Sequence, residues 1–178
     1  AIVPPDTHER ADKLEGNGHT VLAVALAGRV AGLIALRDVL RPEAKEAIAR
    51  LKAQGIHVVM LTGDNERVAT TIATEAGIDE IHAHLLPEDK LRCVREWQEQ
   101  GKRVAFIGDG INDAPALAAA DIGIAMGAAG TDVALETSDI AFLSDDLGKM
   151  PEIVALSRRT LKVIRQNIGF SVFLNIVS

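Results

Sequence analysis

The sequence is poor in cysteine and in aromatic residues. It has one cysteine, Cys93, and no tyrosine, and aromatic residues make up 3% of its 178 residues. A single cysteine excludes a disulfide within the chain and fits a reducing compartment. The core must therefore be built from Ala, Val, Ile and Leu, which the chain can supply because 48% of its residues are hydrophobic.

Acidic residues outnumber basic residues, 25 to 19. The formal net charge is −6, whereas nucleic-acid-binding proteins usually present a basic face. We therefore expect no nucleic-acid partner. Residues 1–15 lack the charged-then-apolar pattern of a signal peptide.

The apolar segment at residues 168–178 is shorter than the roughly 20 residues that a membrane-spanning helix needs. It is either a buried C-terminal helix or the first part of a membrane helix. Basic residues are typical of the cytoplasmic side of a membrane segment, which favours the membrane interpretation over a solvated helix face. The basic residues that precede this segment are Arg158, Arg159, Lys162 and Arg165.

Apolar runs and turn residues predict a hairpin followed by alternating helices and strands. Two apolar runs, Thr20–Leu26 and Arg29–Leu36, flank Ala27-Gly28 and predict a β-hairpin. The later alternation predicts a doubly wound α/β fold with a mostly parallel sheet. Its predicted strands are 56–61, 80–83, 104–107, 122–125 and 140–143, and its helices are 42–54, 66–76, one from Pro87, a short Ala-rich one after Gly110, and one from Met150.

Two loops that follow predicted strands carry groups suited to phosphate and magnesium. In open α/β sheets, ligands bind at the carboxyl ends of strands. Asp109 and Asp113 offer hard oxygen ligands to Mg²⁺. The Thr62 hydroxyl and the Asn112 amide can hydrogen-bond phosphate oxygens, and Lys90 supplies a positive charge. Either loop alone could be an ordinary strand-to-helix turn, but together they predict a phosphoryl-transfer site that lacks a nucleophile. The loops are Thr62-Gly63-Asp64 and Gly108-Asp109-Gly110-Ile111-Asn112-Asp113.

Longer motifs surround these loops. They are Met60-Leu61-Thr62-Gly63-Asp64-Asn65, Leu86-Pro87-Glu88-Asp89-Lys90, Gly108-Asp109-Gly110-Ile111-Asn112-Asp113-Ala114-Pro115-Ala116-Leu117, Ala120-Asp121-Ile122-Gly123-Ile124-Ala125-Met126-Gly127 and Gly130-Thr131-Asp132-Val133-Ala134. Together they resemble the P-type cation ATPases of the haloacid-dehalogenase superfamily. The motif that begins at Gly108 is the most specific, because simple phosphatases of the superfamily share G-D-G-x-N-D but not its continuation.

The resemblance implies a cycle in which ATP phosphorylates an aspartate and a cation crosses a membrane as the phosphate is hydrolysed. It implies Mg²⁺ and ATP as cofactors, with Asp109 holding Mg²⁺ and Asp113 shaping the metal site and anchoring Lys90. Thr62, Lys90 and Asn112 are implied contacts of the phosphoryl group. Gly63 and Asp64 belong to the same catalytic loop, with Asp64 near the nucleotide.

The chain departs from the family pattern because the nucleophile motif D-K-T-G-T is absent. We therefore expect a piece of the catalytic unit that does not phosphorylate itself. Residues 1–37 are expected to be the end of the nucleotide-binding domain, 38–165 an incomplete phosphorylation domain, and 166–178 the start of a transmembrane helix. In the resembled fold the missing strand is central, so the sheet should be interrupted or collapsed between strands 56–61 and 104–107.

Further motifs resemble the heavy-metal branch of these pumps. They are Arg41-Pro42-Glu43-Ala44, Leu156-Ser157-Arg158-Arg159-Thr160 and Gln166-Asn167-Ile168. The implied partners are ATP, a heavy-metal cation bound in membrane segments outside this sequence, and the lipid bilayer. The implied location is a membrane, with this portion on the cytoplasmic side. Asn175 favours copper, although Leu174-Asn175 matches neither the copper pattern nor the zinc, cadmium or lead pattern in full.

Two other classes of function remain open. A soluble haloacid-dehalogenase-type phosphatase needs its own nucleophilic aspartate after an apolar strand. Asp6, Asp12 and Asp38 do not fit, because each lacks that strand or the residues that should follow it. A non-catalytic module that binds Mg²⁺ or phosphate without turnover is the second alternative.

Overall fold

Helices and strands alternate along most of the chain, as the sequence predicts. The computed structural model describes residues 3–16, 19–36, 40–108, 112–127, 136–144 and 146–177. The helices are α1 (Thr7–Glu15), α2 (Pro42–Ala53), α3 (Glu66–Ala76), α4 (Pro87–Glu99), α5 (Ala114–Ala119) and α7 (Lys149–Val177). The strands are β1 (Thr20–Leu26), β2 (Arg29–Leu36), β3 (Val59–Leu61), β4 (Glu80–His82), β5 (Ala105–Gly108), β6 (Ile122–Ala125) and β7 (Ile140–Ala141).

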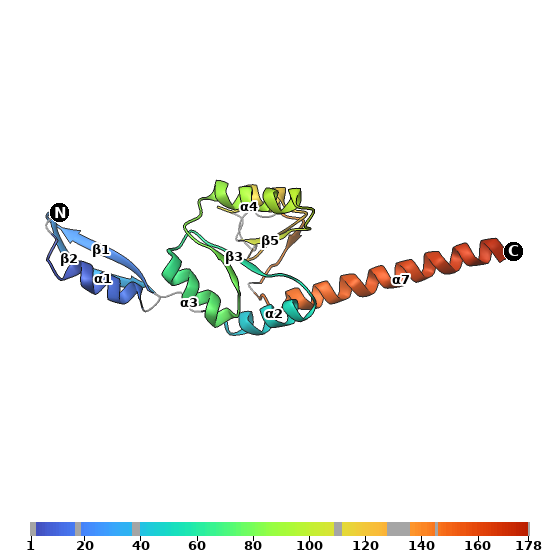
Figure 1. The fold of residues 1–178 in the computed structure, drawn as a ribbon, viewed down its shortest axis with the longest axis horizontal. Coiled ribbons are helices and arrows are strands. Elements are labelled where there is room, and N and C mark those ends of the chain that lie inside the picture. The colour runs from blue at the N-terminus through green and yellow to red at the C-terminus, as the bar shows by residue number, and fades with distance from the viewer. Residues whose placement is uncertain are drawn as a thin grey trace.

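The N-terminal unit is the predicted hairpin with α1 beside it, at one end of the molecule (Figure 1). β1 and β2 pair antiparallel, from Thr20 opposite Leu36 to Leu26 opposite Arg29. The connecting residues Ala27 and Gly28 have φ angles of 48° and 75°. A two-residue hairpin turn of type I′ requires positive φ at both positions, which explains the glycine. α1 contains the polar stretch around Asp12 and has no buried residues.

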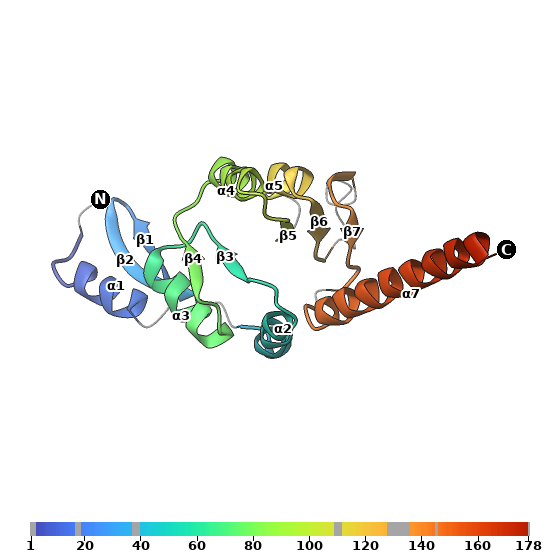
Figure 2. The ribbon, with the colours of Figure 1, turned by 45° about the vertical axis from the view of Figure 1, so that its right-hand side comes forward.

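The rest of the chain forms a layered α/β unit. β3 pairs with β4, and β5, β6 and β7 pair in that order, all in parallel. α4 and α5 lie on one side of the strands, and α2, α3 and the start of α7 lie on the other (Figure 2). The predicted class is therefore confirmed as α/β with mostly parallel strands, but in small sheets and not as one continuous doubly wound sheet.

The sheet is interrupted between β3 and β5. In the described parts of the chain, β3 pairs with β4 alone and β5 with β6 alone, while β1 and β2 pair only with each other. The two strands nevertheless share apolar packing, since Leu61 of β3 lies against the buried cluster that includes Phe106 of β5. The predicted interruption is confirmed, and the hairpin does not supply a central strand.

Two strands are shorter than the sequence predicts. β3 begins at Val59 because the Ile56 amide donates to the Leu51 carbonyl at 3.1 Å and so belongs to the end of α2. Gly55, with φ of 77°, makes that turn. β7 ends at Ala141, although the Phe142 amide still donates to Ala125 at 2.8 Å. Apolar runs mark where a strand can form, whereas the available partner sets its length.

Two buried clusters fill the α/β unit. One is formed by Leu51, Ile124, Phe142 and Met150, and joins α2, α7 and the β6–β7 edge. The other is formed by Val94, Phe106, Ala116 and Leu117, under α4 and α5. A Cβ atom at Gly123 would lie 2.4 Å from the Leu117 carbonyl oxygen, so α5 can pack this closely on β6 only over a glycine.

α7 extends away from the α/β unit (Figure 1). Its 29 residues correspond to about 43 Å of helix. Met150 and Pro151 are buried, whereas residues 155–176 are exposed. α7 continues through the predicted segment 166–178 as far as Val177. Among the described residues, no helix combines the length and the hydropathy needed to cross a bilayer.

Candidate phosphoryl-transfer site

The loop Thr62-Gly63-Asp64 leaves β3 as a tight, hydrogen-bonded turn. The Thr62 hydroxyl donates to Asp64 Oδ2 at 2.8 Å and accepts from the Asp64 amide at 3.1 Å. The Thr62 amide donates to the His82 carbonyl at 3.0 Å, which continues the β3–β4 ladder by one residue. The hydroxyl and the carboxylate are therefore held side by side at the carboxyl end of β3.

The same loop is tied to the segment that leads into α4. The Leu85 amide donates to the Thr62 carbonyl at 3.0 Å, and the His84 amide donates to the Asp64 carbonyl at 2.9 Å. A Cβ atom at Gly63 would lie 3.3 Å from the Leu85 carbonyl oxygen. The glycine thus allows the two chain segments to approach closely.

Asn65 has a structural role in this loop that the sequence reasoning missed. Its Oδ1 accepts from the Val68 amide at 3.0 Å, and its own backbone is extended, so it is the N-cap of α3. The signal was present, because Asn directly before Glu66 at the start of an apolar-periodic segment is a helix start. The cap fixes where the loop ends.

Lys90 is held in the first turns of α4. Pro87 begins that helix, and Asp89 Oδ2 accepts from the Leu86 amide at 2.9 Å, which satisfies a free donor at the helix start. Lys90 Nζ lies 2.7 Å from Asp113 Oδ1, and the two side chains are only 16% and 13% exposed. The structure therefore brings Lys90 and Asp113 together as a largely buried ion pair.

Asp113 is packed against the end of β5. A Cβ atom at Gly108 would lie 2.6 Å from Asp113 Oδ2 and 2.8 Å from Asp113 Cβ. The Asp113 carbonyl accepts from the Leu117 amide at 2.8 Å, which anchors it at the start of α5. Gly108 is thus needed so that the carboxylate can reach Lys90 from this position.

The structure describes the remaining predicted residues only in part. Asp109 lies outside the described residues, as do its neighbours Gly110 and Ile111, and Asn112 is described and exposed. Within the described residues, no hydrogen bond joins the Thr62 loop to Lys90 or Asp113, and no group of His, Cys, Asp and Glu residues is arranged to hold a metal ion. Of the two predicted metal ligands, Asp109 and Asp113, the structure therefore describes only Asp113. A carboxylate set of Asp109 and Asp113 is nevertheless of the hard oxygen type that Mg²⁺ prefers.

An unusually acidic carboxylate, Asp121, fixes the other end of β5. It accepts from the Val104 amide at 3.0 Å and from Arg103 at 2.6 Å. The Val104 amide first, and then Arg103 and Gln98, lower the pKa of Asp121 to about 2. The sequence did not indicate this role, because the partners of Asp121 are a backbone amide and side chains from two separate segments, the end of α4 and the loop before β5.

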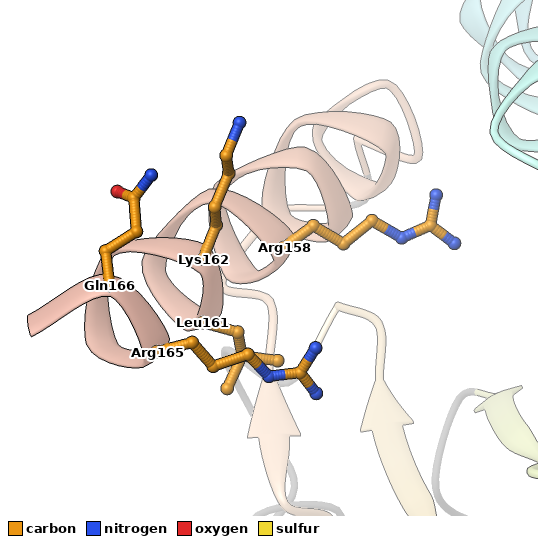
Figure 3. A pocket seen from close by; sticks show the side chains of 5 residues that line it. All are labelled: Arg158, Leu161, Lys162, Arg165 and Gln166. Carbon is orange, nitrogen blue, oxygen red and sulfur yellow. The ribbon is translucent and has the colours of Figure 1, made fainter. Parts of the chain in front are cut away.

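Two hollows on the surface lie away from these residues. One of ≈510 Å³ runs along α7 (Figure 3), and one of ≈450 Å³ lies beside β7. Neither is lined by a residue of the candidate site.

Comparison with known proteins identifies the family of this chain. A family model described as haloacid dehalogenase-like hydrolase matches residues 2–121. The chain is 54% identical over 168 residues to the manganese-exporting P-type ATPase of Mycobacterium tuberculosis, covering 94% of the chain and 23% of that relative. It is 48% identical to the copper-exporting P-type ATPase of Staphylococcus haemolyticus, covering 94% of the chain and 21% of that relative.

A solved structure of a related pump also matches the chain. The crystal structure of a zinc-transporting PIB-type ATPase in its E2.Pi state matches with a TM-score of 0.77 at 49% identity, covering 93% of this chain and 27% of that one. The chain spans about a quarter of the length of these relatives, whose names cover manganese, copper and zinc and so single out no cation. The chain belongs to the haloacid dehalogenase-like hydrolase family and, within it, to the catalytic region of the heavy-metal P-type ATPases.

Proposed function

We propose that this chain supplies the Mg²⁺- and phosphate-binding part of the phosphorylation site of an ATP-driven heavy-metal cation pump. The observation that carries the proposal is the buried pair of Lys90 and Asp113 at the carboxyl end of β5. A buried ammonium at the end of a parallel strand is suited to neutralise phosphoryl oxygens. The family membership also supports the proposal, because the relative that is 54% identical to this chain is a P-type ATPase.

In this proposal the side chains act mainly by position and charge. Lys90 binds the transferred phosphoryl group, and Asp113 holds the ammonium in place. The Thr62 hydroxyl turns from Asp64 towards a phosphate oxygen, and Asn112 adds a second hydrogen bond. Phosphoryl transfer needs this kind of charge neutralisation more than it needs covalent chemistry.

Asp109 and Asp113 are the proposed Mg²⁺ ligands, with Asp64 near the nucleotide. When bound, Mg²⁺ neutralises phosphate oxygens during transfer. ATP is the proposed phosphoryl donor, and the nucleophilic aspartate lies outside this sequence, because D-K-T-G-T is absent. The proposed partners of the whole pump are a heavy-metal cation and the lipid bilayer, with this region on the cytoplasmic side.

The decisive experiment restores the missing part. The chain replaces the corresponding segment of the manganese-exporting relative, to which it is 54% identical, and the chimera is incubated with γ-labelled ATP. We expect an acid-stable phosphoenzyme that falls on the order of 100- to 1000-fold in Lys90→Ala. Lys102→Ala, an exposed lysine just after α4, is the control and should leave phosphorylation unchanged.

The 178-residue chain alone should form no acid-stable phosphoenzyme under the same conditions. A label on an aspartate of the isolated chain would contradict the proposal and favour the soluble phosphatase. Wild-type phosphorylation in the Lys90→Ala chimera would instead favour a module without a catalytic role.

A further inference from the structure

The parallel pairing of β3 with β4 ends in a one-residue irregularity at the Thr62 loop. The register of these strands, extended by one residue, places Thr62 opposite Ala83. The Thr62 amide donates to the His82 carbonyl at 3.0 Å, as this register requires. Regular parallel pairing would then bring the His84 amide to the Thr62 carbonyl, but that carbonyl accepts from Leu85 at 3.0 Å. One extra residue is therefore inserted before α4, as in a β-bulge.

His84 is the extra residue, and its backbone lies in the left-handed region with φ of 56°. In the described part of the chain, Ala27 of the hairpin turn is the only other residue besides glycines with positive φ. Histidine is one of the few non-glycine residue types that are enriched in this conformation. Among the described residues, the exposed imidazole makes no hydrogen bond or ion pair. The backbone conformation alone thus explains a histidine at this position.

The bulge directs a second amide at the Thr62 loop. Because Leu85 bonds to the Thr62 carbonyl, the His84 amide leaves the ladder and donates to the Asp64 carbonyl at 2.9 Å. The Asp64 carboxylate in turn accepts from the Thr62 hydroxyl at 2.8 Å. A Cβ atom at Gly63 would lie 3.3 Å from the Leu85 carbonyl oxygen, so the loop lies close against this segment. The conformation of His84 therefore decides whether the loop is bonded at both of its ends.

We propose that His84 is a positioning residue for phosphoryl transfer, whose left-handed backbone fixes the Thr62 loop and so places the Thr62 hydroxyl. The inference rests on the proposed function, in which that hydroxyl contacts the phosphoryl group. Bulges are over-represented next to active sites, where they redirect side chains or end strand pairing. A residue in a sparsely populated backbone region persists only where its surroundings constrain it. Here the amides of His84 and Leu85 supply that constraint, in the segment that connects β4 to α4 (Figure 2).

The first measurement is amide hydrogen exchange in the 178-residue chain, followed by NMR without nucleotide or Mg²⁺. At positive φ a β-branched residue is strongly disfavoured, whereas glycine and asparagine are tolerated. His84→Val should therefore speed exchange of the Leu85 amide on the order of 10-fold, because the loop opens more often. His84→Gly and His84→Asn should stay within about 3-fold of wild type.

The matched control is Ala27→Val, which places the same side chain at a φ of 48° in the hairpin turn. It introduces similar backbone strain in a unit that holds no residue of the candidate site, and it should leave exchange of the Leu85 amide unchanged. Circular dichroism checks that each variant keeps its helix content.

The second measurement uses the phosphorylating chimera. His84→Val should lower the maximal rate of phosphoenzyme formation on the order of 10-fold, with the KM for ATP unchanged, because the Thr62 hydroxyl acts on the transferred group. His84→Asn and Ala27→Val should phosphorylate at the wild-type rate.

Four outcomes would overturn the proposal. They are wild-type exchange of the Leu85 amide in His84→Val, an equal effect in Ala27→Val, wild-type phosphorylation in His84→Val, and slow phosphorylation with normal exchange in His84→Asn. The last outcome would assign the role to the imidazole. A wild-type chimera that forms no phosphoenzyme would refute the proposed function, while the exchange measurement, which needs no phosphoryl transfer, would still decide whether His84 fixes the loop.

Discussion

The ion pair between Lys90 and Asp113 permits a quantitative prediction about stability. At 2.7 Å, two unit charges attract by about 6 kcal/mol at an effective dielectric constant of about 20. Most of that is offset because both groups lose water, with side chains only 16% and 13% exposed. We expect a coupling of about 1–2 kcal/mol, more than an exposed pair provides.

The perturbation is a double-mutant cycle with Lys90→Met and Asp113→Asn. Lys90→Met keeps most of the aliphatic chain but leaves the Asp113 carboxylate unpaired against Gly108, at a cost of about 2–3 kcal/mol. Asp113→Asn keeps the shape but leaves the ammonium without its counter-ion, at a cost of about 1–2 kcal/mol. The double variant should lose about 1–2 kcal/mol less than the sum of the two.

The assay is urea unfolding of the chain, followed by the fluorescence of Trp97. This is the chain's one tryptophan, and it lies on α4, the helix that carries Lys90. The matched control is Lys52→Met, which removes a lysine paired with Asp79 at 39% and 79% exposure, and should cost less than about 1 kcal/mol. Strict additivity in the cycle, or an equal cost in the control, would refute the reasoning.

Three further outcomes are expected. Gly108→Ala should destabilise the chain by about 1–3 kcal/mol, because the new Cβ would lie 2.6 Å from Asp113 Oδ2. Gly32 of β2, where a new Cβ would meet no atom within 4 Å, should tolerate Ala, and urea unfolding compares the two variants. The pKa of Asp121 is lowered to about 2, so the ionised carboxylate stabilises the fold fully above about pH 4, and this contribution is lost as the pH falls towards 2. In Asp121→Asn, the free energy of unfolding should therefore depend less on pH in that window. Among the described residues, β3 and β5 each have an edge without a pairing strand, which should make the chain associate as its concentration rises; light scattering measures this, and a monomer at all concentrations would contradict it.

The elements that the sequence predicted best are those with explicit start and stop residues. α3 runs from Glu66 to Ala76 as predicted, because Asn65 caps its start and Gly77 ends it with φ of 78°. The hairpin is also as predicted, since Ala27-Gly28 sets its register. The strand at 56–61 was predicted too long, because the pairing partner β4 has only three residues.

The candidate site shows the limit of reasoning from spacing. The rule that ligands bind at the carboxyl ends of strands was enough to select Thr62, Asp64 and Asp113 as polar groups that follow strands. The pairing of Lys90 with Asp113, 23 residues apart, follows from how α4 lies on β5 and was implied only by resemblance. The role of Asp121 could not be found, because its partners are a backbone amide and flexible side chains with no pattern.

The two halves of the candidate site stand on strands that do not pair with each other among the described residues, so side-chain packing sets how they lie relative to one another; besides the contact of Leu61 with the Phe106 cluster, this packing involves α4. α4 has the required contacts on both sides. The segment that leads into it holds the Thr62 loop through the amides of His84 and Leu85. Further along the helix, Lys90 reaches Asp113, and the fully buried Val94 lies in the same cluster as Phe106 of β5. Since β3 and β5 share no hydrogen bonds among the described residues, a shift of α4 on β5 would change how Lys90 and the Thr62 loop lie relative to Asp113, and the packing of α4 on the Phe106 cluster therefore helps to set the geometry of the described part of the site.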